Sequence, residues 1–104
     1  MIVTMGESVP DREIVSILGT VKGNTVRTRF FGRDIMAALR NLVGGEVPEY
    51  TKLMAEAREQ ALDRMIYDAE QKGADAVISL RVTTSMIMGG SAELLAYGTA
   101  VKLS

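Results

Sequence analysis

The side chains in this 104-residue chain that are able to do chemistry are mainly arginines, carboxylates and hydroxyls, because histidine, cysteine and tryptophan are absent. Without cysteine there is no thiolate nucleophile, thiolate metal ligand or disulfide. Without histidine the commonest general base and zinc ligand is missing. No residue is therefore assigned as catalytic or metal-binding and no cofactor is identified. The sequence favours a role other than catalysis without excluding an enzyme.

One candidate ligand-binding group lies in a predicted strand, where Arg81, Thr83 and Ser85 occupy alternate positions. Alternate residues of a strand point to the same face, and arginine is suited to bidentate capture of a carboxylate or phosphate. Two other interpretations stay open. The row is also typical of the solvent-facing side of an antiparallel sheet, and Arg81 is equally able to pair with an acid of a second copy.

A second candidate is the basic cluster formed by Arg27, Arg29 and Arg33. It precedes a predicted helix start, where free backbone N–H groups favour an anion. Asp34 offsets part of its charge, and neither glycine-rich phosphate-binding motif occurs in the chain. A structural or interface role is therefore favoured for the cluster, with anion binding by Arg27 and Arg29 as the alternative.

The overall charge narrows the classes of partner. Twelve Lys and Arg against 13 Asp and Glu give a formal charge of −1, whereas nucleic-acid-binding domains carry a clear basic excess. No apolar run approaches the roughly 20 residues that span a bilayer. The first residues lack the basic and apolar regions of a signal peptide. The sequence thus predicts a cytoplasmic protein that binds neither nucleic acid nor membrane.

The hydrophobic periodicity predicts one α+β domain over residues 1–104. Strands are expected at 13–26, 76–86 and 92–103, with a further short strand at 2–5. A long amphipathic helix is expected over 49–72, with an apolar stripe that includes Ala61, Met65 and Ala69 and with small alanines that let it lie close on a sheet. A short helix is expected over 35–43. The expected architecture is a small antiparallel or mixed sheet packed on one long and one short helix.

The predicted strand 13–26 has apolar residues at both sets of alternate positions: Val15, Ile17 and Val21 in one set, and Ile14, Leu18 and Val26 in the other. Both faces of this strand therefore need cover. In the strand 76–86, alternation places Ile78, Leu80 and Val82 on one face and Val77 with the polar row on the other. Self-association would cover the second face of the first strand, and coverage by the short helix is the alternative.

Several segments together resemble the YbjQ-like family: residues 13–23, 44–46, 50–65, 73–78 and 96–101. The resemblance implies a small α+β subunit that assembles with copies of itself into a ring, most often a pentamer, and it implies no settled activity. One description of that family is heavy-metal binding. Soft metals prefer thiolate and imidazole ligands, which this chain lacks. Five of its seven methionines are interpreted as packing residues, with Cu(I) binding through thioethers as the alternative: Met36, Met54, Met65, Met86 and Met88.

Overall fold

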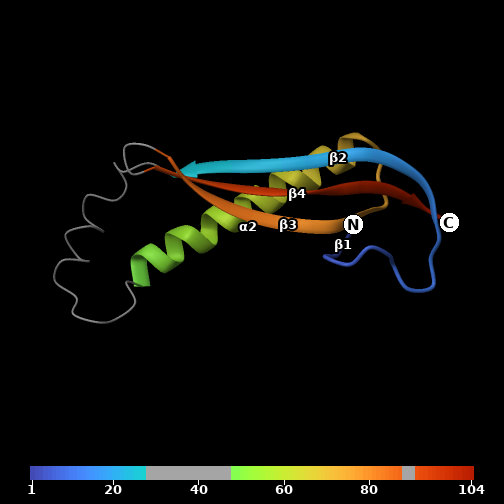
Figure 1. Ribbon diagram of the computed structural model, residues 1–104, viewed down its shortest axis with the longest axis horizontal. Helices are drawn as coiled ribbons and strands as arrows, with labels where there is room; N and C mark the ends of the chain where they lie inside the picture. Colours follow the sequence, from blue (N-terminus) through green and yellow to red (C-terminus); the bar gives the residue numbers. More distant parts are fainter. Residues whose placement is uncertain (28–47, 88–90) are drawn as a thin grey trace.

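The computed structural model describes residues 1–27, 48–87 and 91–104. They form β1 (Ile2–Val3), β2 (Ile14–Arg27), α2 (Pro48–Gln71), β3 (Ala76–Ile87) and β4 (Ser91–Leu103). The strands make one mixed sheet in the order β1-β3-β4-β2, with β1 parallel to β3 and the other neighbours antiparallel (Figure 1). The α+β class, the strands and the long helix are as predicted. The predicted short helix lies outside the described residues.

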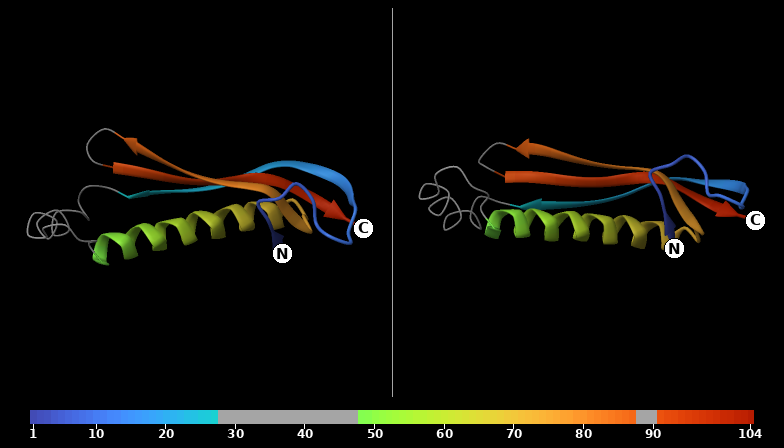
Figure 2. Two further views of the ribbon diagram at one scale, coloured as in Figure 1. Left: turned by 60° about the horizontal axis from the view of Figure 1, so that its bottom comes forward. Right: turned by 90° about the horizontal axis from the view of Figure 1, so that it is seen from below.

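α2 packs on one side of the sheet, here called the helix face (Figure 2). The core between the two layers consists of residues without exposed surface: Val21, Ala61, Met65, Ala69, Val77, Ala96 and Ala100. The three helical members are spaced four residues apart, so the apolar stripe predicted from the sequence is the stripe that packs. No helix among the described residues is long and apolar enough to cross a membrane.

Gly23 of β2 sets how closely α2 approaches the sheet. A Cβ atom on Gly23 would overlap the backbone of Ala61 and Met65, so a residue with a side chain does not fit without moving the helix. Ala57 and Ala61 are fully buried at the same contact. The hydroxyl of Thr25 donates a hydrogen bond of 2.9 Å to the carbonyl oxygen of Ala57, which satisfies this buried polar group. α2 therefore lies directly beneath β2.

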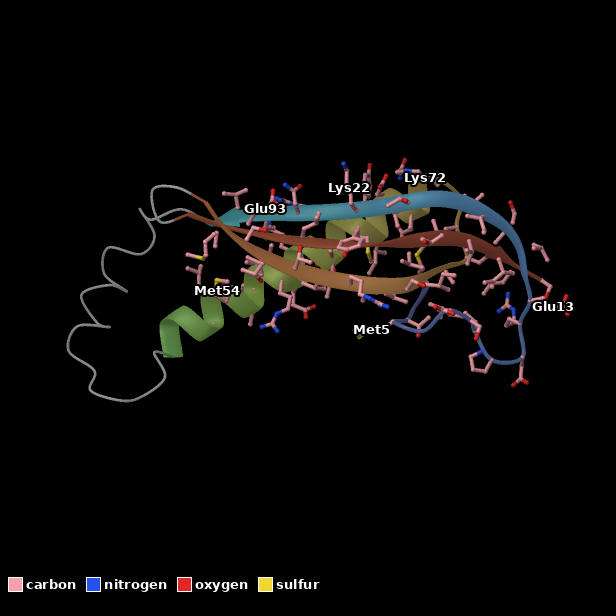
Figure 3. The ribbon with its side chains drawn as sticks, in the orientation of Figure 1. Met5, Glu13, Lys22, Met54, Lys72 and Glu93 are labelled. Atoms are coloured by element: carbon pink, nitrogen blue, oxygen red, sulfur yellow. The ribbon has the colours of Figure 1, made fainter. Side chains whose placement is uncertain are left out.

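Side chains of α2 also reach the outer edge of β2. The backbone N–H of Lys22 donates to Asp68 Oδ2 at 3.2 Å. The guanidinium of Arg64 donates to the carbonyl oxygen of Asn24 at 2.6 Å. Lys72 forms an ion pair with Asp68 at 2.9 Å. Lys22 and Lys72 both lie at this edge (Figure 3). The middle of the β2 edge therefore already has hydrogen-bond partners, which protects it from pairing with another strand.

The N-terminal segment crosses to the other side of the sheet, here called the far face (Figure 2). Val9 packs there in a second buried cluster with Ala76, Ile78, Val101 and Leu103. The same segment extends the edge of β3 beyond β1, through hydrogen bonds from Ser79 N–H to the Gly6 oxygen and from Leu80 N–H to the Thr4 oxygen. One end of the far face is therefore covered within the chain.

An irregularity in β2 makes its predicted faces wrong. The pairing with β4 shifts between Ile14 and Ser16 and again between Ile17 and Gly19, where Gly19 has a φ of 113°. Because each β-bulge changes which residues point to a given face, Ile17 is 70% exposed whereas Val21 is buried on the helix face. In the other predicted set, Leu18 packs on the helix-face core and Val26 is 46% exposed.

β3 contains a second irregularity, and the predicted faces before it are also wrong. The pairing passes from Ile78 opposite Thr99 to Arg81 opposite Tyr97, which leaves two β3 residues opposite Gly98. Ser79, the first of them, has a φ of 54°. Ile78 therefore packs on the far face with Val9, whereas Leu80 packs on the helix-face core. Val77 and Val82 also belong to the helix face, where they lie opposite Ala100 and Ala96.

Candidate functional site

The three predicted site residues of β3 do lie together on the far face. Arg81, Thr83 and Ser85 are exposed and occupy alternate positions of β3 after the irregularity at Ser79. Their partners on β4 are Tyr97, Leu95 and Glu93 respectively. Cross-strand partners project to the same face of a sheet. The polar row predicted from the sequence is therefore a continuous strip along the part of the far face that the N-terminal segment leaves uncovered.

Arg81 has hydrogen bonds that reduce its freedom to bind a ligand. Its Nη1 atom donates to the carbonyl oxygen of Met5 at 3.2 Å and to that of Leu80 at 2.7 Å. The Met5 contact ties the N-terminal segment to the edge of β3. The other guanidinium N–H groups make no hydrogen bond to the described residues and remain directed to an exposed surface. Arg81 thus combines a structural contact with spare donor capacity.

Sequence reasoning missed Lys22 as a member of this strip. The register places Lys22 of β2 and Arg81 of β3 on either side of Tyr97 in β4. Two cations, from the strands on either side of β4, therefore flank one half-buried tyrosine on β4. Alternation along β2 alone does not reveal this, because the neighbours of Lys22 depend on the register between strands. Beside the row, Asn24 Nδ2 donates to Glu93 Oε2 at 3.4 Å.

Arg27, another predicted ligand residue, is not brought to this row. Arg27 is the last residue of β2 and its backbone lies opposite Ala92. Arg81 lies opposite Tyr97, and five residues of strand correspond to about 17 Å. Arg29 lies outside the described residues. The structure thus separates the backbone position of Arg27 from that of Arg81, and binding by Arg27 and Arg29 remains a prediction.

Two carboxylates have shifted acidities, and both serve structural contacts. The hydrogen bond from Lys72 lowers the pKa of Asp68, supported by the N–H of Lys22 and opposed by desolvation. The N–H of Leu103, which donates at 2.9 Å, lowers the pKa of Asp75, supported by the charge of Lys102. Both carboxylates are held charged by fixed donors. Neither has the raised pKa expected of a general acid at neutral pH.

The described residues do not fit a soft-metal site. They contain no group of three or more acidic side chains placed to hold one ion, and the chain has neither cysteine nor histidine. Thioether sulfur is the remaining soft ligand. Met65 is fully buried in the core, whereas Met5 and Met86 are exposed. No metal-dependent step is derived from these residues.

The fold and the far-face strip define a small α+β protein without an evident catalytic centre in its described part. A solved structure supports the fold. The crystal structure of a protein of unknown function in the DUF74 family from Pediococcus pentosaceus has a TM-score of 0.67 and 14% sequence identity, and the match covers 100% of this chain and 98% of that chain.

The chain belongs to the YbjQ-like family, whose description is "Putative heavy-metal-binding" and which matches residues 1–104. UPF0145 proteins are its relatives. The protein of Archaeoglobus fulgidus is 57% identical over 99% of this chain and 95% of its own length. Those of Shewanella frigidimarina and Methanosarcina acetivorans are 52% and 50% identical, over 99% of this chain and 96% and 97% of their own lengths. The resemblance predicted from the sequence is confirmed.

Proposed function

We propose that the protein is a homo-oligomer, a ring of five copies, whose role is structural or is to bind small ligands in pockets at the interfaces between its copies. One observation carries the assembly: β3 presents an unpaired edge beside exposed apolar side chains. Leu80 N–H points outward to Thr4. Because outward groups recur every second residue, those of Val82, Thr84 and Met86 also point outward, and no described residue pairs with them.

Exposed apolar residues at both flanks of the sheet support the same proposal. Val15 and Ile17 on β2 are 61% and 70% exposed, and Met86 on β3 is 74% exposed. Contact between such surfaces on successive copies removes apolar area from water. Contact between two different surfaces, repeated from copy to copy, closes into a ring when the rotation between copies allows. The count of five is the expectation that the family resemblance carries.

Light scattering coupled to size-exclusion chromatography tests the assembly. We expect a mass near five times the 11.3 kDa of one chain at micromolar concentration. Thr84→Pro removes one outward N–H from the β3 edge, which a strand edge tolerates, and should lower the mass. Thr84→Val keeps that N–H and serves as the matched control. A wild-type monomer would refute the proposal, and an unchanged mass for a folded Thr84→Pro would exclude the edge from the contact.

Anion binding on the far face is a second candidate, and the flanking of Tyr97 by Lys22 and Arg81 favours it. The two cations lie on the strands on either side of β4, and we expect them to share one carboxylate or phosphate above Tyr97. We expect pyrophosphate or citrate to raise the melting temperature at fixed protein concentration. Lys22→Gln should abolish the shift without disturbing the Met5 contact, which Arg81→Ala would remove. Absence of a shift with both compounds would refute this candidate.

A further inference from the structure

A groove runs along the helix face between α2 and β3. α2 lies beneath β2 and packs less against β4 and least against β3. A helix is about 10 Å wide and strands are about 4.8 Å apart, so one helix covers about two strands. The part of β3 that follows Leu80 therefore extends past the helix. In Figure 2 the β3 and β4 ribbons stand away from α2 at the end of the sheet where β3 finishes and β4 begins.

The described residues that line the groove come from three elements. Met54 and Arg58 belong to α2, Val82 and Thr84 to β3, and Leu94 to β4. The cavity volume is about 380 Å³, which falls within the range of small-molecule sites. Leu94 is buried at 2% exposure and Val82 is 39% exposed. Met54 is half-buried beside β3 (Figure 3). The groove therefore has an apolar interior that opens to solvent.

Arg58 gives the groove a positive charge. It follows Met54 by four residues, which places both on the same side of α2. Arg58 makes no ion pair or hydrogen bond with another described residue, in contrast to Arg64, which donates to the Asn24 carbonyl oxygen. Thr84, on the opposite side of the groove, adds an exposed hydroxyl. A cation with free donors thus lies next to apolar walls.

We infer that this groove binds a small carboxylate with an apolar body. The guanidinium of Arg58 matches a carboxylate in bidentate geometry. The side chains of Met54, Val82 and Leu94 are suited to remove the hydrocarbon part of such a ligand from water. The polar far face offers no comparable apolar surface. An apolar neutral molecule would leave the guanidinium unpaired, and a polar anion would leave the walls exposed. This inference does not depend on the proposed ring.

Calorimetric titration with octanoate and with octanol, which has the same chain length without charge, tests the inference. We expect the wild type to bind octanoate about tenfold more tightly than octanol, since a hydrogen bond to a charged group contributes roughly that factor. Arg58→Gln should lower octanoate affinity about tenfold and leave octanol unchanged. Val82→Glu should abolish binding of both. Lys22→Gln, which removes the same charge from the far face, is the matched control.

Three results would overturn the inference: no binding of octanoate, equal affinity for octanoate and octanol, or unchanged octanoate binding by Arg58→Gln. A second copy in the groove would also overturn it. In that case the wild type fails to bind octanoate and Val82→Glu lowers the mass measured by light scattering. A monomeric wild type that binds octanoate through Arg58 would refute the ring and leave the carboxylate site in place.

Discussion

β2 and β3 are the two long strands that flank β4, yet the described residues close the middle of the β2 flank and leave the part of the β3 flank beyond Leu80 open. At β2, α2 lies against Gly23 and its Asp68 and Arg64 side chains hold the outer edge. At β3, beyond Leu80, the described residues cover neither the helix face nor the edge, and Met86 is 74% exposed. The two flanks therefore differ in what they offer to another molecule.

This difference follows from the position of one helix. The width of a helix suffices to cover about two strands. Gly23 determines which two strands the helix covers, because it allows α2 to approach β2 most closely. The described residues leave the outer part of the remaining strand, β3, uncovered. A surface that is suited to binding thus arises where α2 no longer covers the sheet, and such a surface needs no catalytic motif.

Replacing a methionine on each flank should give the largest contrast. Met65→Ala removes a fully buried core side chain and should lower the free energy of unfolding by about 3 kcal/mol. Met86→Ala removes a side chain that is 74% exposed in a single copy; it should change the free energy of unfolding of that copy by less than about 0.5 kcal/mol, and burial of Met86 between copies would add to this loss. Urea denaturation at one fixed protein concentration measures both. A loss for Met86→Ala as large as that for Met65→Ala would show that the β3 flank is buried in solution.

The close contact at β2 should be the next most sensitive feature. Gly23→Ala places a Cβ against the backbone of Ala61 and Met65 and should cost about 2 kcal/mol through overpacking. Gly6→Ala is the matched control, because its Cβ would meet no atom closer than 3.5 Å. Thermal and urea unfolding compare the two variants. If Gly23→Ala were as stable as Gly6→Ala, the helix would not be held at this position.

The sequence was sufficient for the elements but not for their faces. The helical stripe through Ala61, Met65 and Ala69 is a local pattern, and it was predicted correctly. The faces of β3 were wrong because the positive φ lies at Ser79, a residue type with no preference strong enough to indicate it. Tertiary pairing with β4 imposes that conformation, so no local pattern reveals it.

The candidate sites show the same contrast between what one element reveals and what only the assembled fold reveals. Arg81, Thr83 and Ser85 were found because they lie on one strand without a bulge between them. Lys22 was missed because its proximity to Tyr97 depends on the register of β2 against β4. The groove at Arg58 depends on where α2 ends its contact with the sheet, which is a property of three elements together. Spacing within one element therefore predicts a row of residues, whereas a site shared by strands and helix requires the fold.

The hydrogen bonds at the β2 edge should give the smallest of these effects, and one that depends on pH. The pKa of Asp68 is lowered in the folded protein, chiefly by Lys72. A lowered carboxyl pKa stabilises the fold above the ordinary value of 3.8, and this contribution is lost as the pH falls through the folded-state pKa. Asp68→Asn should therefore cost a few tenths of a kcal/mol at pH 7, as exposed ion pairs do.

Urea denaturation of the wild type and Asp68→Asn at pH 7 and at successively lower pH tests this expectation. The difference in stability should shrink below about pH 3.8 and then disappear, because the wild-type carboxyl becomes neutral like the asparagine. Asp63→Asn removes a carboxylate from an exposed position of the same helix and controls for the change in net charge. A difference that persists unchanged in acid would mean that the Asp68 charge contributes nothing, and that the β2 flank is closed by the packing at Gly23 alone.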